Sequence, residues 1–212
     1  MFDEGYIKFH CHWIQAEPIP PSELEEINHW RNHLYDLGLI GVYQNGVGFG
    51  NISIRATKSA GFIISGTQTG NLPILSEQHY TRVIDFDLAK NSLTCEGPVR
   101  ASSESLTHAI LYQTCAEANA VIHIHHPKLW NQLLDQVPTS SREVPYGTPE
   151  MAKEVTRLFA DSDLQAKKIL VMGGHQDGVV TFGENLDEAA TILFAYLGKL
   201  ESGKFKEGPA LA

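Results

Sequence analysis

The chain has 212 residues and a mass of 23.4 kDa, which suits one domain with a substantial buried core. Its 16 lysines and arginines against 25 aspartates and glutamates give a formal net charge of −9. This balance argues against a general nucleic-acid binder or a protein held on anionic lipid, because both need a basic face.

The chain shows no sign of a membrane span or a leader. No apolar run approaches the roughly 20 residues that cross a bilayer, and the first residues are acidic where a signal peptide is basic. We therefore expect a cytoplasmic protein. Its three cysteines, Cys11, Cys95 and Cys115, are widely spaced without a CxxC motif, and so form neither a disulfide framework nor a zinc knuckle.

The first elements along the chain are an arm and a helix. We expect residues 1–21 to form an extended arm that ends in a proline-rich stretch. A helix should begin at Ser22, which has Glu25 three residues on as a capping box, and should end at Gly38. Its apolar face contains Leu24, Ile27, Trp30, Leu34 and Leu37.

Strands and helices then alternate without a linker or an internal repeat. Alternation and apolar runs predict strands over residues 51–57, 61–65, 80–87, 91–95, 120–125, 169–172 and 178–182, with a turn at 88–91 that makes a hairpin of the third and fourth. Helical periodicity predicts helices over 102–119, from Thr148 as N-cap to about 160, and over 186–200. This mixture predicts a single α/β sandwich in which helices cover a sheet.

The strongest local motif is His123-Ile124-His125-His126, at the end of the strand predicted over 120–125. Side chains two residues apart in a strand point to the same face, so His123 and His125 share one. Two imidazoles on a rigid strand are a good start for a transition-metal site. The alternative is two polar residues on an exposed sheet face. His126 should point away from the pair and could carry protons.

A third candidate ligand is His175, in the sequence MGGHQDG directly after a predicted strand. The glycines before it let the backbone turn sharply and bring the side chain close to neighbouring atoms. By itself His175 is either a third metal ligand or a loop histidine in water.

Glu104 is the candidate acid, at the start of the helix that precedes the histidine strand. Ser102 or Ser103 could cap this helix, with Glu104 favoured by the helix dipole. The functional interpretation uses the same geometry: two hydroxyls at a helix N-terminus bind an anion, and an acid beside a metal can act as general base. His108 shares a helix face with Glu104. It either lies behind the metal ligands and supports them, or is an ordinary core or surface histidine.

Two glycine-containing segments, residues 48–51 and 65–70, offer flexible backbone and short polar side chains that can donate hydrogen bonds to an anion. Neither is a P-loop, and no GxGxxG motif opens a helix. Dinucleotide binding therefore has no support in the sequence.

Taken in order, these motifs resemble those of the class II aldolase/adducin family. The matching motifs are Gly50-Asn51-Ile-Ser, Ile64-Ser65-Gly66, Ser102-Ser103-Glu104, His123-Ile-His125, and His175 before Gly178-Val179-Val180. The family includes fuculose-phosphate and rhamnulose-phosphate aldolases, ribulose-phosphate 4-epimerase and methylthioribulose-phosphate dehydratase. The likeness runs from about Ser22 to Leu200, which divides the chain into an arm (1–21), a family-like domain (22–202) and a loose tail (203–212).

The resemblance implies a zinc or similar divalent ion held by His123, His125 and His175, with Glu104 as the catalytic acid/base. It implies a three-layer domain whose central, mainly antiparallel sheet has helices on both faces. It also implies a homotetramer with active sites at subunit contacts. The positions that hold the substrate phosphate correspond to Asn51, Ser65, Gly66, Ser102 and Ser103.

The expected function is a metal-dependent aldolase or lyase that makes or breaks a C–C bond in a small sugar phosphate or related hydroxy-ketone. The metal would stabilise an enediolate as a Lewis acid, and Glu104 would move the proton. Tyr146, in VPYGTPEMA, lies near the matching place of a tyrosine that protonates the aldehyde oxygen in these aldolases. A plain loop aromatic is the alternative for Tyr146.

The chain departs from the family pattern at two places. Its histidine loop has two extra residues, which put Asp177 near the pocket, and the segment 65–70 has no lysine or arginine, so an unphosphorylated hydroxy-keto acid stays possible. A dehydratase or epimerase with the same metal is the nearest alternative. Glu rather than Asp at position 104 argues against the epimerase, and the dehydratase stays an alternative. A non-catalytic, adducin-like binding module is the alternative from another class.

Overall fold

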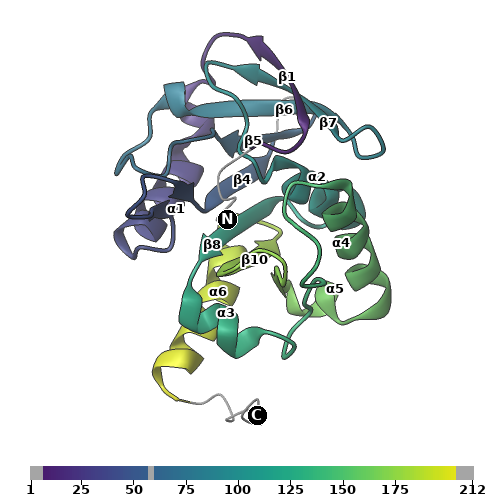
Figure 1. The fold of residues 1–212 in the computed structure, drawn as a ribbon. Helices are drawn as coiled ribbons and strands as arrows, with labels where there is room; N and C mark the ends of the chain where they lie inside the picture. The colour runs from purple at the N-terminus through teal and green to yellow at the C-terminus, as the bar shows by residue number, and fades with distance from the viewer. Residues whose placement is uncertain (1–6, 57–59, 204–212) are drawn as a thin grey trace.

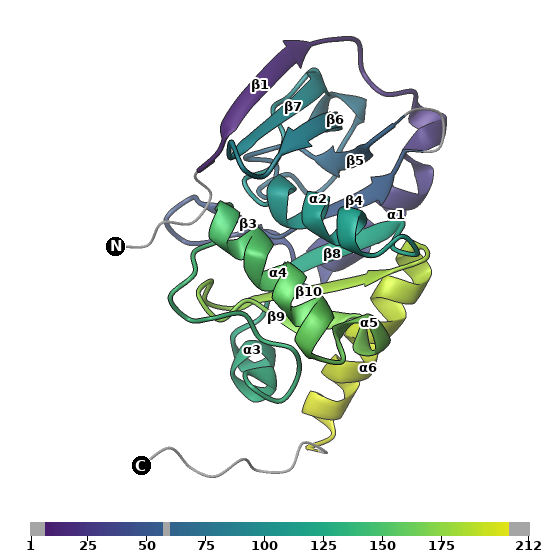
Figure 2. The ribbon, with the colours of Figure 1, turned by 90° about the vertical axis from the view of Figure 1, so that its right-hand side faces the viewer.

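A sheet of eight strands runs through the middle of the protein, with helices on both of its faces (Figures 1 and 2). The computed structural model describes residues 7–56 and 60–203. The strands, in their order across the sheet, are β1 (His10–Gln15), β7 (Ser92–Gly97), β6 (Tyr80–Asp87), β5 (Phe62–Ser65), β4 (Asn51–Arg55), β8 (Ala120–His125), β10 (Gly178–Gly183) and β9 (Ile169–Val171). Every neighbouring pair is antiparallel except β1 and β7, which run parallel.

The helices form the outer two layers of a three-layer domain. One face of the sheet is covered by α1 (Glu25–Asp36), α3 (Pro127–Leu133) and α6 (Leu186–Glu201), and the other by α2 (Ser105–Thr114) and α4 (Pro149–Asp161). The short elements are η1 (Pro21–Glu23), η2 (Glu77–His79), α5 (Leu164–Lys167) and a two-stranded sheet of β2 (Gly41–Val42) and β3 (Gly48–Phe49). No helix among the described residues is long and apolar enough to cross a membrane.

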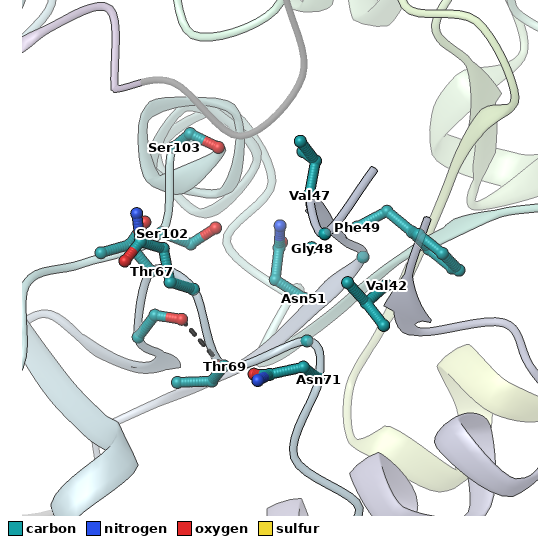
Figure 3. A pocket seen from close by; sticks show the side chains of 15 residues that line it. Val42, Val47, Gly48, Phe49, Asn51, Thr67, Thr69, Asn71, Ser102 and Ser103 are labelled. Carbon is teal, nitrogen blue, oxygen red and sulfur yellow. Dashed lines mark hydrogen bonds between the residues drawn. The ribbon is translucent and has the colours of Figure 1, made fainter. Parts of the chain in front are cut away.

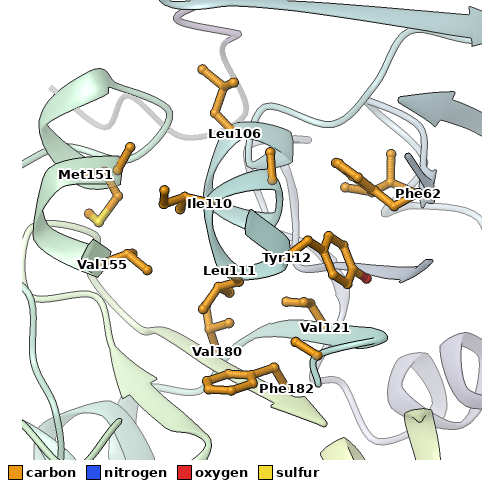
Figure 4. Close-up of a cluster of buried hydrophobic side chains, with 14 of the residues drawn as sticks. Phe62, Leu106, Ile110, Leu111, Tyr112, Val121, Met151, Val155, Val180 and Phe182 are labelled. Atoms are coloured by element: carbon orange, nitrogen blue, oxygen red, sulfur yellow. The ribbon is translucent and has the colours of Figure 1, made fainter. Parts of the chain in front are cut away.

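Alternation along β8 decides which face carries the site. Ile122 and Ile124 belong to the core beneath α1, α3 and α6, whereas Val121 belongs to the core beneath α2 and α4. His123 and His125 therefore point to the α2 side of the sheet, because successive side chains in a strand alternate. Figure 4 shows this second core, in which Leu111 of α2 lies next to Val180 of β10.

Several predicted elements are confirmed. The strands predicted over 80–87 and 120–125 have the predicted bounds, and the predicted hairpin is the antiparallel pair β6–β7. Thr148 caps α4, since its side chain accepts a hydrogen bond from the backbone N–H of Met151. The fold class, an α/β domain with a mainly antiparallel sheet between two helical layers, is confirmed as well.

The first helix differs from the prediction. The helix begins at Glu25 rather than Ser22, with Leu24 at the N-cap position and no side-chain cap, because a 3-10 turn at 21–23 precedes it. Leu37, expected on the apolar face, is 51% exposed because it lies past the last helical turn. Gly38 ends the helix as predicted, in the left-handed conformation at φ +69°.

The helix predicted over 102–119 is shorter than expected. It spans Ser105–Thr114, and Glu104 rather than Ser102 or Ser103 lies at the N-cap position, without a side-chain cap. Cys115 is already extended, and Asn119 donates its N–H to the carbonyl of Gly183 in β10. The chain leaves the helix early because it must reach β8.

Part of the N-terminal segment belongs to the sheet. Residues 10–15, expected within an extended arm, form the strand β1, which pairs with β7 over six residues. Residues 1–6 of the expected arm lie outside the described residues. The short helix α3, the strand pair β2–β3 and α5 were not predicted. The strand expected over 51–57 ends at Arg55, and residues 57–59 and the tail after 203 lie outside the described residues.

Candidate metal centre and substrate cavity

His123 and His125 lie side by side on β8, between β4 and β10. Asn51 of β4 is the register partner of His123, and Gly178 of β10 is the partner of His125. Both imidazoles are buried, and their ring centroids are 4.9 Å apart. The alternative of polar residues on an exposed sheet face is therefore wrong.

His175 reaches the same place from the loop between β9 and β10. A Cβ on Gly173 or Gly174 would lie 2.2 Å from the Ser140 carbonyl oxygen or 2.1 Å from that of Val144, so only glycine permits this close packing. His175 is itself buried, and its Nε2 lies 2.8 Å from Nε2 of His125. The alternative of a loop histidine in water is wrong too.

The three histidines could hold a metal ion. Each offers a ligand atom, and these atoms all lie within 4.8 Å of one another. Nε2 of His123 is buried and has no hydrogen-bond partner among the described residues. Burial lowers the pKa of His123 and of His125 well below the usual value, so both rings are neutral and keep a lone pair for a metal. Neutral imidazoles are typical ligands of zinc and other first-row divalent ions.

Three side chains lie behind these rings, at their Nδ1 atoms. The hydroxyl of Tyr43 is 2.6 Å from Nδ1 of His125. The side-chain amide of Asn51 is 3.3 Å from Nδ1 of His123, and Oε1 of Glu104 is 3.4 Å from Nδ1 of His175. Polar groups at Nδ1 fix the rotation of an imidazole and aim its Nε2.

Glu104 is buried at the start of α2, with only 1% of its surface exposed. Its Oε2 accepts a hydrogen bond of 2.9 Å from the Thr107 hydroxyl one helical turn on, while Oε1 faces His175. The structure thus brings the predicted acid to the histidine cluster. Its carboxylate is oriented by two groups, which suits a side chain that moves one proton at a defined place.

Tyr146 is also brought to the cluster. Its ring is buried, and its centroid is 4.4 Å from that of His175, edge to face. The ammonium of Lys8 lies 3.8 Å from the centroid of the Tyr146 ring, in cation–π contact. Lys8 precedes β1, so the pairing of β1 with β7 delivers a positive charge to the edge of the site.

Lys8 and Tyr43 lie at the site although the sequence did not predict them. Neither belongs to a motif: Lys8 precedes a strand that was expected as an arm, and Tyr43 follows β2, which was not predicted. The only sequence signal for Tyr43 was its place in a glycine-rich segment, next to residues 48–51, which were expected to donate hydrogen bonds to an anion.

A cavity of about 460 Å³ adjoins the histidine cluster (Figure 3). Four of the five predicted phosphate-binding residues line it, and Figure 3 shows the Ser102 and Ser103 side chains facing Asn51 across it. Phe49 also lines the cavity, with its ring 5.5 Å from that of His125. The predicted residues in the lining are Asn51, Gly66, Ser102 and Ser103.

Ser65 is not in this lining. Its hydroxyl accepts a hydrogen bond from the backbone N–H of Ile52 inside the sheet. Among the described residues, the cavity lining contains no lysine or arginine, so an anion there would meet neutral donors. Such donors, in a cavity at a helix N-terminus, still favour negative charge.

The remaining candidates have other positions. His108 is buried away from solvent, with Nδ1 2.7 Å from the Ser53 hydroxyl. His126 caps α3, because its Nδ1 accepts a hydrogen bond from the Leu129 N–H. This position agrees with the prediction that its side chain points away from His123 and His125. Asp177 is buried in the loop after His175, and its carbonyl oxygen accepts from the His126 N–H.

Comparison with solved structures shows the same fold. YgbL from Escherichia coli has a TM-score of 0.62 at 20% identity, over 89% of this chain and 91% of that one. An L-fuculose 1-phosphate aldolase has a TM-score of 0.63 at 18% identity, over 92% of both chains. The L-fuculose-1-phosphate aldolase of Thermus thermophilus has a TM-score of 0.53 at 22% identity, over 87% and 96%.

The amino-acid sequence matches a family model but no single curated protein. The family model of the class II aldolase and adducin N-terminal domain matches residues 43–197, which is well over half of the chain and contains Asn51, Glu104 and all three histidines of the cluster. The chain therefore belongs to the class II aldolase and adducin family.

Proposed function

We propose that this protein is a divalent-metal-dependent aldolase-type lyase acting on a small sugar phosphate or a related hydroxy-ketone. The observation that supports it most is the approach of the Glu104 carboxylate to within 3.4 Å of His175, in a buried three-histidine cluster beside a polar cavity. An ion held by His123, His125 and His175 would supply Lewis-acid chemistry to a substrate oxygen. We propose zinc, because three neutral imidazoles form a common catalytic zinc site.

The side chains of the chain would share the remaining work. Asn51, Ser102, Ser103 and the backbone at Gly66 would bind the anionic end of the substrate in the cavity, and Ser65 would support this wall from within the sheet. Their hydroxyl and amide donors would orient the substrate without contributing full charges.

Glu104 would take the proton from the substrate carbon or hydroxyl. Its burial and its two fixed neighbours hold Oε1 and Oε2 in one orientation, which a base needs at the moment of transfer. When the C–C bond is cleaved, Tyr146 would take the proton from the hydroxyl that becomes the aldehyde, and when the bond forms it would donate a proton to the aldehyde oxygen. The cation over its ring, Lys8, would favour the negative charge that the phenol oxygen then carries.

Two further properties belong to this proposal. We expect a cytoplasmic homotetramer with its active sites at subunit contacts, as the family resemblance implies. The name of one structural neighbour is an aldolase/epimerase/decarboxylase, and a dehydratase or epimerase with the same metal site is the nearest alternative for this chain.

Exchange of a carbon-bound proton tests this proposal. Metal-loaded protein would be incubated with dihydroxyacetone phosphate in deuterated water and followed by NMR, with and without a chelator. We expect exchange that the chelator abolishes. Dihydroxyacetone as a second probe tests the need for a phosphate.

Absence of exchange with metal bound would contradict an aldolase that uses dihydroxyacetone phosphate and would favour a dehydratase, an epimerase or a substrate without phosphate. Absence of both exchange and bound metal would favour the non-catalytic, adducin-like module.

A further inference from the structure

Two cysteines, Cys11 and Cys95, meet where the edge strand β1 joins the sheet. Cys11 lies opposite Leu93 and Cys95 opposite Trp13, so the two thiols are diagonal neighbours on one face of the β1–β7 pair. Their sulfur atoms are 3.7 Å apart although the residues are 84 positions apart in the sequence. The spacing of the cysteines along the chain gives no hint of this pair.

One of the two cysteines is partly accessible to solvent, and the pair loses a proton easily. Cys95 is fully buried, whereas Cys11 is only partly buried. A hydrogen bond from the Cys11 thiol, reinforced by Thr81 and the nearby positive charge of Arg100, lowers the pKa of Cys95 to about 7. The same hydrogen bond raises the pKa of Cys11. Near neutral pH part of the protein therefore carries one thiol and one thiolate at this pair, and a thiolate is the nucleophile in sulfur oxidation.

The third cysteine lacks these features. Cys115 is buried, and its sulfur lies 3.4 Å from a carboxylate oxygen of Glu117. Burial, together with this hydrogen bond to Glu117, raises the pKa of the Cys115 thiol. Cys115 is therefore a matched internal control, a thiol of the same chain that stays protonated.

We propose that Cys11 and Cys95 are a modification site, at which a peroxide-class oxidant joins β1 to β7 through a disulfide bond. The thiolate attacks one peroxide oxygen, an S–O bond forms as the O–O bond breaks, and the released hydroxide is protonated to water. The second sulfur then attacks the oxidised one. The S–S bond forms, the S–O bond breaks, and the departing hydroxide leaves as water with the remaining thiol proton. Two thiols and one peroxide thus give one disulfide and two waters.

The strand can make the required movement. A disulfide needs the sulfurs to approach to about 2.05 Å, and diagonal neighbours must also draw their backbones slightly together. In the described part of the chain β1 is paired on one side only, by β7, so it can shift without breaking a second ladder. The bond would fasten the strand that follows Lys8, whose ammonium lies at the edge of the candidate metal centre.

Peptide mapping of the native protein tests this site. The folded chain would be treated with about one equivalent of hydrogen peroxide, alkylated in denaturant, and digested with trypsin without reduction. Trypsin separates the three cysteines into peptides 9–31, 91–100 and 101–128. We expect the first two peptides to appear joined, to separate on reduction, and the third to carry the alkyl group.

The controls keep the test specific to the folded pair. Cys115→Ser should form the same linked peptide, Cys11→Ser should not, and oxidation of the denatured chain should scatter links among all three thiols. Oxidation of Cys11 or Cys95 to sulfinic or sulfonic acid without a linked peptide would overturn the proposal. So would a link to Cys115, which the wild-type map shows, or a link between two chains, which non-reducing electrophoresis of the oxidised protein shows as a dimer.

Discussion

At the scale of single residues, the candidate metal centre depends on which nitrogen of each imidazole carries the proton. A metal bound at Nε2 leaves a proton on Nδ1, so the group behind each ring must accept a hydrogen bond. The Tyr43 hydroxyl and the Glu104 carboxylate can both accept one. Asn51 can do so through Oδ1, which is buried and has no hydrogen-bond partner among the described residues, once its amide turns over.

Removing the hydroxyl behind His125 should weaken metal binding. In Tyr43→Phe the ring stays but Nδ1 of His125 loses its acceptor, so we expect the metal dissociation constant to rise about 10- to 100-fold. Competition with a chelator of known affinity measures this. Tyr35→Phe, on helix α1, is the matched control and should bind metal like the wild type. Equal affinity in both variants would show that the Tyr43 contact does not aim the ring.

Replacing the acid separates catalysis from metal binding. In Glu104→Gln the amide oxygen still accepts from His175, so we expect metal affinity to change less than about tenfold while proton exchange on the probe falls by a factor of about 10² to 10⁴. Glu117→Gln, on the surface, is the control.

Two other results for Glu104→Gln would be decisive. Unchanged exchange would move the base to another group, with Asp177 tested first by Asp177→Asn. Loss of the metal would show that the main role of Glu104 is to hold His175 in place.

At the scale of elements, the sequence predicted most where one local signal dominates. The alternation of β8 and the Thr148 cap of α4 depend on neighbouring residues only, and both are confirmed. The long-range elements could not be predicted in this way. The pairing of β1 with β7 joins segments about 80 residues apart, and the end of α2 is set by where the chain must enter β8.

The packing of α2 on β4 should make stability depend on pH. His108 of α2 is fully buried, and burial lowers its pKa to about 3, whereas in the unfolded chain it titrates near 6.5. As the pH falls below about 6.5 the unfolded chain therefore binds a proton that the folded chain does not. This costs roughly 1.4 kcal/mol of stability per pH unit, or about 2 kcal/mol between about pH 7 and about pH 5.

Urea unfolding of the metal-free protein at these two pH values measures this effect. His108→Gln keeps a side chain that can bond the Ser53 hydroxyl but does not titrate, so its stability should fall about 2 kcal/mol less than that of the wild type. His12→Gln, on the exposed side of β1, should behave like the wild type. The same pH dependence in His108→Gln and the wild type would contradict the assignment.

At the scale of the whole molecule, the sheet assembles the site from four distant segments. β8 supplies His123 and His125, the β9–β10 loop His175, the start of α2 Glu104, and the chain after β2 Tyr43. The order of the motifs was enough to predict the first four of these residues through the family resemblance. Tyr43 and Lys8 lie outside any motif, and their positions become visible only when the fold brings them to the site.

Above all, we predict that these three histidines bind one metal ion per chain. Titration of the metal-free protein with Zn²⁺, followed by calorimetry, tests this directly. The wild type and His12→Ala should each bind one ion, whereas His123→Ala should lose this binding, by more than about 100-fold in affinity, with unchanged circular dichroism. A folded His123→Ala protein that keeps a full complement of metal would contradict the ligand set and with it the proposed function.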